Sequence, residues 1–399
     1  MKLIDSIVGF QDELRQIRRA IHAHPELCFE EHHTAGLVAA KLAEWDIPVV
    51  RGLGATGVVG VLHGDRSGRA IGLRADMDAL PVQELNTFAH ASRQAGKMHA
   101  CGHDGHTAML LGAAHYLSRH RDFGGTVYLI FQPAEEMGGG ARRMMDEGLF
   151  SLCPMEAVFG MHNWPGMPAG AFGVAPGPMM ASSNEFRVRV KGKGAHAAQP
   201  HKGIDPIMVA IQVAQAWQTI VSRNRNPLDA AVLSVTQIHA GGTTNVIPDE
   251  ALLVGTVRTY SSQVTDLIES RMHAIARHTA AAFDAEAEFI FERLYPAVVN
   301  HADATALAAR AMQAVAGVDK VDLNVEPSMA AEDFGFMLQQ KPGCYVFIGN
   351  GEGTHRDAGH GLGPCNLHNP SYDFNDALLP IGATYWVRLV QLALSTPPH

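Results

Sequence analysis

The stretch GTVYLIFQPAEE, residues 125–136, begins as an apolar run and ends in two adjacent carboxylates, Glu135 and Glu136. A short, nearly continuous apolar run with β-branched side chains is typical of a strand buried on both faces of a sheet. We therefore expect a buried strand here, with side chains at its carboxyl end that can bind a metal ion or transfer a proton.

Three further runs of this kind surround the stretch, at residues 58–64, 70–80 and 157–165. Segments with helical spacing of apolar residues lie between them, at residues 106–120 and 139–150. Strands that alternate with helices predict an α/β sandwich. Sites in open α/β sheets gather beyond the carboxyl ends of strands, and the polar residues of these runs fall at such ends.

A different pattern begins near Ser182. The segment SNEFRVRVKGKGAHA alternates with a period of two, which is typical of a strand with one exposed face. We expect a small inserted α+β domain, residues 182–294, with a four-stranded antiparallel sheet and two helices. Its expected strands cover residues 183–197, 230–240, 250–260 and 285–296, and its helices cover residues 203–222 and 263–283.

The flanking segments, residues 1–181 and 295–399, are expected to form the first domain together. After the insertion, a strand and a helix return to the first pattern. The further elements expected in this domain are helices at residues 4–21, 32–45 and 377–394 and a strand at residues 345–351.

The composition excludes several classes of protein. The 399 residues are 47% hydrophobic and 18% charged, which indicates well-buried cores rather than disorder. The formal net charge is -9, so we expect no nucleic-acid partner and no attraction to anionic lipid. Acidic residues interrupt the start of the chain where a signal peptide needs an apolar core, and no run approaches the ~18 apolar residues of a membrane span. A cytoplasmic location is therefore expected.

The five cysteines are an odd number and are scattered without a CxxC pair. This pattern does not indicate a disulfide framework. We expect Cys101, which lies among histidines, to be a metal ligand or a nucleophile, and the other four to be buried or surface thiols.

The stretch MHACGHDGH, residues 98–106, combines three histidines, a cysteine and an aspartate. Thiolate, imidazole and carboxylate are the ligands of first-row transition metals. Cys101 and His103 stand two residues apart in a glycine-flanked loop, where both side chains can turn to one point. Taken alone, the stretch leaves three interpretations open: a metal site, a nucleophile with its base, or a polar loop rich in histidine.

The adjacent carboxylates of Glu135 and Glu136 repel each other unless a cation or a shared proton compensates. One would bind a metal ion and the other would take a proton from water, although a solvated acidic turn is the alternative. His162 ends another strand, in GMHNWP, and His368 lies in LHNPSYDFND. Both imidazoles are further candidate ligands.

Asp76 and Asp78 follow the strand in LRADMDALP. Carboxylates at such positions orient metal-bound histidines. For Asp78, a helix cap or a turn is a comparable alternative. Taken together, these candidate ligands are enough to bind two metal ions, which activate water and polarise a carbonyl. The set is Cys101, His103, Glu136, His162 and His368, with Glu135 left as a base.

The motifs resemble, in order and over nearly the whole chain, the amidohydrolase branch of the co-catalytic metal exopeptidases. This branch includes hippurate hydrolases, N-acyl-amino-acid deacylases and plant auxin-conjugate hydrolases. The resemblance implies a phosphorylase/hydrolase-like catalytic domain interrupted by a lid and dimerisation domain. Cys28 and Met137 depart from the small residues expected there, which bears on the pocket mouth. The matching segments are HAHPEL, GLRADMDALP, KMHACGHDGHTAMLLGAA, FQPAEE, GMHN, GKGAHAAQPHKGIDPI, GGTTNVIPDEA, GTVRT, AEDFG and LHNPSYDFND.

The resemblance implies that two divalent ions per subunit bind to the five ligands named above, with Cys101 as a candidate bridge. Glu135 is then the general base. From its place at the strand end, Asp76 is expected to be a supporting catalytic residue, and His99 and His106 are left as shell or structural groups. Zinc and manganese are the expected metals, since thiolate and imidazole suit zinc and carboxylates admit manganese. Cobalt and nickel are alternatives.

In the inserted domain, the resemblance makes His196 a contact to the substrate or to the oxyanion, from its own subunit or from the partner in a homodimer or dimer-based homo-oligomer. It makes Asn245 and Arg258 substrate-binding residues, with less support for His201. An arginine suits a free carboxylate because its planar fork pairs with both oxygens. A strand residue paired across the sheet is the alternative for Arg258.

The expected reaction is hydrolysis of an N-acyl-L-amino acid to a carboxylate and a free amino acid. Glu135 takes a proton from the attacking water and returns it to the leaving amine. The rival interpretations are a dipeptidase or carboxypeptidase, a catalytically silent binder of acyl-amino acids, and a thiol enzyme with Cys101 as nucleophile.

Overall fold

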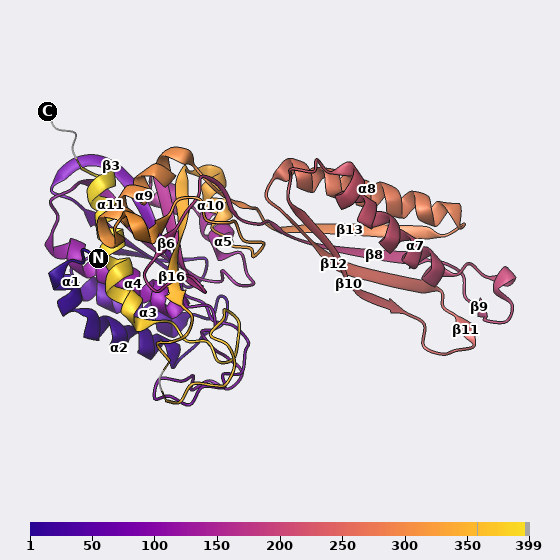
Figure 1. Cartoon of the computed structure of the whole chain (residues 1–399), viewed down its shortest axis with the longest axis horizontal. Helices are drawn as coiled ribbons and strands as arrows, with labels where there is room; N and C mark the ends of the chain where they lie inside the picture. Colours follow the sequence, from indigo (N-terminus) through magenta and orange to yellow (C-terminus); the bar gives the residue numbers. More distant parts are fainter. Residues whose placement is uncertain (357, 396–399) are drawn as a thin grey trace. The chain divides into compact units, whose positions relative to one another are not determined.

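The computed structural model describes residues 1–356 and 358–395, which form two compact units. The larger unit comprises Met1–Met179, Val299–Glu326 and Asp333–His399, and the smaller unit comprises Met180–Val298 and Pro327–Glu332. Figure 1 shows the elements of both units, coloured along the chain.

The larger unit contains an eight-stranded sheet with the order β1-β2-β4-β3-β5-β16-β6-β15. β3 runs parallel to β4 and β5, and β16 runs parallel to β5, whereas β2 is antiparallel to β4. The carboxyl ends of β3, β4, β5 and β16 therefore meet at one edge of the sheet. The bounds are β2 Gly57–His63, β3 Arg66–Asp76, β4 Gly124–Gln132, β5 Ala157–Pro165 and β16 Gly343–Gly351.

Short strands that the sequence did not predict complete the outer part of this sheet. Two of them are only two residues long, so they carry no periodic pattern. The bounds are β1 Val49–Leu53, β6 Phe172–Gly173 and β15 Val321–Asp322, while β7 Gly177–Met180 and β14 Val298–Asn300 lie where the chain passes between the units.

Helices α2, α3, α4, α9 and α11 contribute to the same apolar core as the sheet. The single helix expected at residues 4–21 is divided at Phe10 (φ -97°, ψ 0°) into α1 and α2. The bounds are α1 Asp5–Gly9, α2 Gln11–His22, α3 His32–Glu44, α4 His103–Arg119, α5 Gly140–Asp146, α6 Leu149–Leu152, α9 Ala302–Ala316, α10 Gly335–Gln340 and α11 Leu379–Ala393.

The smaller unit has a four-stranded antiparallel sheet with the order β10-β12-β8-β13. Alternate residues of β12 are buried, and α7 and α8 cover that face (Figure 1) with a core that includes Phe186 and Trp217. The bounds are β8 Ser183–Lys191, β9 Ala195–His196, α7 Pro206–Thr219, β10 Ala231–Ala240, β11 Val246–Ile247, β12 Glu250–Thr259, α8 Ser262–Ala282 and β13 Glu286–Tyr295.

The predicted fold class, an α/β domain with an inserted α+β domain, is confirmed by the two sheets. The smaller unit differs in extent from the insertion expected at residues 182–294, because it also takes in Pro327–Glu332. The physical reason is backbone pairing: the amide of Ala181 donates to the carbonyls of Ser328 and Ala330, at 3.1 and 2.9 Å. Within the described ranges, no helix is long and apolar enough to cross a membrane.

Candidate active site

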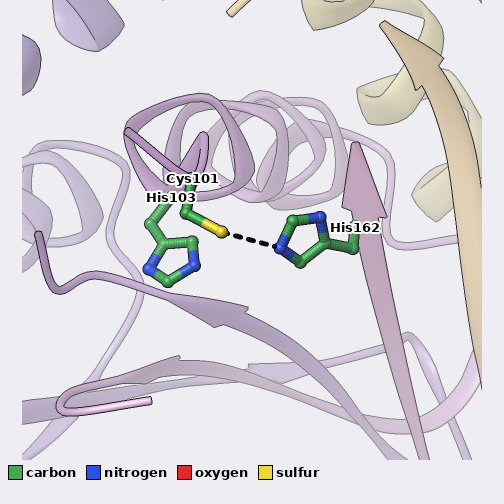
Figure 2. A group of neighbouring side chains, drawn as sticks. All are labelled: Cys101, His103 and His162. Carbon is green, nitrogen blue, oxygen red and sulfur yellow. Dashed lines mark hydrogen bonds between the residues drawn. The ribbon is translucent and has the colours of Figure 1, made fainter. Parts of the chain in front are cut away.

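Three candidate ligands, Cys101, His103 and His162, lie together beyond the carboxyl ends of the parallel strands of the large sheet (Figure 2). His162 lies on β5, His103 is the first residue of α4, and Cys101 precedes that helix. Cys101 Sγ lies 3.3 Å from His162 Nε2, and one donor atom from each of the three residues lies within 4.8 Å of the others. All three side chains are buried.

The backbone between Cys101 and His103 fits only a glycine. Gly102 has φ +98°, and a Cβ there would lie 2.2 Å from Oδ1 of Asn163 and 2.7 Å from the hydroxyl of Tyr372. This left-handed residue is the N-cap of α4, so the helix begins three residues before the expected segment at residue 106. His103 therefore projects from a first helical turn rather than from a loop.

A second group of ligands shares Cys101 with the first. Donor atoms of Cys101, Glu136 and His368 lie within 4.8 Å of one another, and His368 Nε2 lies 3.4 Å from Glu136 Oε1. His368 has φ +63°, and its amide donates to the carbonyl of Ala100 at 2.7 Å, which ties it to the Cys101 segment. Cys101 is thus common to the two groups.

Hydrogen bonds orient the two buried imidazoles. Nδ1 of His103 donates to the carbonyl oxygen of Asp78 at 2.8 Å, and Nδ1 of His162 donates to that of Asn163 at 2.7 Å. Each Nε2 therefore carries its lone pair toward the cluster. Nε2 of His103 is buried and makes no hydrogen bond to any described residue. An orphaned imidazole nitrogen beside a thiol and a carboxylate fits a divalent transition metal.

The electrostatics of the cluster favour a cation. Burial opposes protonation of His103, but the carboxylates of Asp76, Asp78 and Glu136 outweigh it and raise its pKa to about 10. Burial and the charges of Glu136 and Glu135 raise the pKa of the Cys101 thiol well above its usual value. Thiol catalysis needs a lowered cysteine pKa, so this environment argues against Cys101 as an unaided nucleophile.

Glu135 lies at the edge of the ligand cluster. It is buried, and its Oε2 lies 4.0 Å from Nε2 of His103. Its ligand atom lies within 4.8 Å of those of His103 and Glu136, but it belongs to neither group that contains Cys101. Its Oε1 accepts from the amide of Asp333 at 3.4 Å. A carboxylate beside, rather than within, both ligand groups is placed to exchange protons with a group bound there.

Asp76, the last residue of β3, and Asp78 form hydrogen bonds with different histidines. Asp78 Oδ1 lies 3.2 Å from Nδ1 of His103, and its Oδ2 accepts from the amide of Glu136 at 2.9 Å. Asp76 Oδ1 instead bonds to Nδ1 of His106 at 2.6 Å. His106, expected to be a structural group, thus forms a polar layer with Asp76 behind the ligands.

Several residues of this polar layer were missed by sequence reasoning. Arg74 is fully buried and donates to Asp76, to Gln132 Oε1 at 2.8 Å and to Asp333 Oδ1 at 3.0 Å. Asn163 bonds to both His106 and Tyr372. The available signal was a charged residue inside an apolar strand, since a buried arginine requires partners.

The three predicted substrate-binding residues lie in the smaller unit. His196 on β9 pairs with Val246 on β11, and the carbonyl of Asn245 accepts from the amide of Ala197 at 3.0 Å, so the first two lie together on one exposed ribbon. Arg258 is half-buried near the end of β12, eight residues after Glu250. Eight residues of strand span roughly 26 Å, so Arg258 lies far along that strand from its start.

Comparison with known proteins assigns the chain to a family. It matches Peptidase family M20/M25/M40 over residues 72–392, and it belongs to this family. The resemblance inferred from the motifs is thereby confirmed. The chain is 41% identical over 389 residues to a hippurate hydrolase of Campylobacter jejuni, which covers 98% of both chains.

Two other relatives are named for different activities. An N-acetylcysteine deacetylase of Bacillus subtilis is 39% identical, covering 97% of this chain and 98% of its own. A thermostable carboxypeptidase of Saccharolobus solfataricus is 40% identical, with 87% and 88% covered. Among solved structures, a Bacillus subtilis protein described as a dinuclear metal binding peptidase is 34% identical, with a TM-score of 0.83 and coverage of 98% and 99%.

Proposed function

We propose that this chain is an amidohydrolase that uses two divalent ions to cleave N-acyl-L-amino acids into a carboxylate and a free amino acid. The observation that carries the proposal is the pair of ligand groups that share Cys101, with Glu135 beside both. The relatives described as a hippurate hydrolase and an N-acetylcysteine deacetylase support this substrate class, since each name denotes an N-acyl amino acid.

One ion would be held by Cys101, His103 and His162, and the other by Cys101, Glu136 and His368. Zinc and manganese fit this mixture of thiolate, imidazole and carboxylate best. When bound, the ions supply Lewis acidity that polarises the amide carbonyl and makes water a nucleophile at neutral pH.

The residues of the chain then carry the protons and orient the substrate. Glu135 removes a proton from the attacking water and delivers it to the leaving nitrogen, with Oε1 held by the amide of Asp333. The buried environment of the carboxylate excludes competing solvent. Asp78 accepts hydrogen bonds from the ring of His103 and from the backbone amide of Glu136, and it thereby holds these two ligands in fixed positions relative to each other.

Substrate recognition is proposed for His196, Asn245 and Arg258, with Arg258 pairing with the free carboxylate. Glu250, at the start of β12, pairs with Lys191, which comes five residues before His196 in the chain, whereas Arg258 lies near the other end of β12. This separation supports a homodimer in which the partner subunit completes the site. The five free cysteines support a reducing compartment, and we propose the cytoplasm.

A carboxypeptidase is the second candidate, because one relative carries that name over most of the chain. The two activities differ in the group on the acyl side of the scissile amide. A screen of N-benzoyl, N-acetyl and dipeptide substrates, with metal-stripped and reconstituted protein, separates them. We expect hydrolysis of N-acyl amino acids that is lost on chelation and restored by zinc or manganese.

Three outcomes of the screen would contradict the proposal. Preference for dipeptides would favour the peptidase. Activity that survives removal of the metals would favour the thiol enzyme. Binding of acyl-amino acids without turnover in the reconstituted protein would favour the silent binder.

A further inference from the structure

The residue before the proposed base has an unusual backbone. Ala134 has φ +53°, in the left-handed region that residues with a Cβ rarely adopt, and it is fully buried. Glu135 and Glu136 follow it directly, so the backbone angles of Ala134 set the direction of both carboxylates. A strained residue at such a place persists only when its surroundings hold it.

A buried carboxylate from another segment holds this turn. Oε1 of Glu31 accepts from the amide of Ala134 at 2.9 Å and from the amide of Phe29 at 3.0 Å. Its Oε2 accepts from the hydroxyl of Thr56 at 2.5 Å. Glu31 is itself fully buried, immediately before α3, and is remote in sequence from the other site residues.

The other side of the turn is closed by its own backbone. The carbonyl of Ala134 accepts from the amides of Gly138 and Gly140, at 3.3 and 3.0 Å. A Cβ at Gly140 would lie 1.7 Å from the carbonyl oxygen of Pro133, so the closure requires glycine there. The amide of Ala134 is thus anchored by Glu31 and its carbonyl by the glycine-rich segment.

We propose that Glu31 is a positioning residue that holds Ala134 in the left-handed conformation and thereby aims Glu135 and Glu136 into the ligand cluster. Glu31 touches neither substrate nor reacting atoms and acts through the backbone of Ala134. This inference rests on the proposed function for the role of Glu135, but not for the position of Glu136 as a ligand. A displacement of catalytic groups by about 1 Å costs on the order of 100-fold in rate.

The kinetic test compares Glu31→Ala and Glu31→Gln. Glutamine retains an acceptor oxygen for the amides of Ala134 and Phe29, so Glu31→Gln is expected to keep kcat within about threefold of the wild type. Glu31→Ala is expected to lower kcat on the order of 100-fold while KM changes by less than about threefold. Glu31→Asp, with a shorter reach, provides a second variant with the same expected loss if Glu31→Ala does not fold.

A second substitution distinguishes positioning from general stability. Glycine adopts the left-handed region without strain, so Ala134→Gly is expected to restore about tenfold or more of the kcat lost in Glu31→Ala or Glu31→Asp. The matched control is Ala55→Gly, because Ala55 also has a positive φ of +69° but lies outside this turn. Ala55→Gly is expected to restore nothing.

A metal titration provides a readout that is independent of turnover. Manganese(II) binding, followed by electron paramagnetic resonance, is expected to weaken by about tenfold at one of two sites in Glu31→Ala and to recover with Ala134→Gly, since carboxylate orientation contributes to metal affinity. If the wild-type protein hydrolyses no N-acyl amino acid, the proposed function is wrong, and this titration still decides the role of Glu31. Wild-type kcat and manganese affinity in Glu31→Ala or Glu31→Asp would overturn the inference. So would a folded variant whose losses Ala134→Gly does not reverse.

Discussion

Nε of Arg18 lies 2.8 Å from Oδ2 of Asp104, and neither side chain is exposed to solvent. Asp104 follows His103 in the first turn of α4, so this ion pair anchors the helix that carries a proposed ligand. Arg18 also pairs with Asp373, and the guanidinium holds the pKa of that buried carboxyl well below its usual value against the effect of burial.

Arg18→Met is expected to lower the free energy of unfolding by about 3–5 kcal/mol, because it removes the buried guanidinium that pairs with the carboxylates of both Asp104 and Asp373. The matched control is Arg15→Met, which removes an exposed pair with Asp12 and should cost less than about 1 kcal/mol. Urea denaturation of both variants checks the difference. Equal losses of unfolding free energy in the two variants would contradict the prediction that the buried ion pairs of Arg18 stabilise the fold more than the exposed pair of Arg15.

His22 is expected to make stability depend on pH. Burial opposes its protonation, but hydrogen bonds to Asp104 at 2.8 Å and Glu84 at 3.2 Å prevail and raise its pKa to about 9. A raised histidine pKa stabilises the fold fully below pH ~6.5, and this contribution disappears as the pH rises through about 9. The difference in unfolding free energy between wild type and His22→Gln should therefore shrink by about 3 kcal/mol from pH 6 to pH 9.5. A difference that is constant over this range would contradict the assignment.

Glu135→Gln is expected to retain both metal ions and to lose roughly 100-fold to 10,000-fold in kcat, because an amide cannot take the proton from water. Metal content measured by mass spectrometry and kcat measured on an N-acyl amino acid check the two halves. Glu156→Gln, at an exposed pair with Arg69, is the control and should keep wild-type activity. Wild-type turnover in Glu135→Gln would refute its role as base.

Gly102→Ala is expected to disrupt the ligand cluster, because the new methyl group would meet Asn163 Oδ1 at 2.2 Å in addition to the strain of φ +98°. Gly148→Ala is a matched control, since Gly148 also precedes a helix with φ +100° but has no atom within 4 Å of the place that a methyl group would occupy. The control should lose about 1–2 kcal/mol of stability, from backbone strain alone. Thermal unfolding and metal content measure both, and only Gly102→Ala should lose metal.

Part of the site could be predicted from the sequence, because some of its candidate ligands lie at the carboxyl ends of apolar segments. Glu136 and His162 were accessible in this way, since parallel strands present their carboxyl ends at a common edge. The membership of Cys101 in two ligand groups was expected only from the family resemblance and not from the residues themselves, because it depends on the separation of His162 and His368 in space. His103 was expected in a loop, since no periodicity shows that Gly102 starts the helix.

Other features carried too little signal. α9 was not predicted, because its many alanines occupy both faces of the helix and blur the apolar periodicity. Glu31 gave no indication of its place, since it is one of two adjacent glutamates and its partners are backbone amides. His99 is fully buried with no hydrogen bond from either ring nitrogen to the described residues, and burial lowers its pKa to about 3, which agrees with a structural role.

The pairing of β7 with β14 has a consequence for the engineering of the chain. It places the entry of the smaller unit, at Gly177–Met180, beside its main exit, at Val298–Asn300, so the segment between them can be exchanged as one piece without stretching either junction. A chimaera that joins a foreign insertion at these two points should fold as two units and keep its ion stoichiometry.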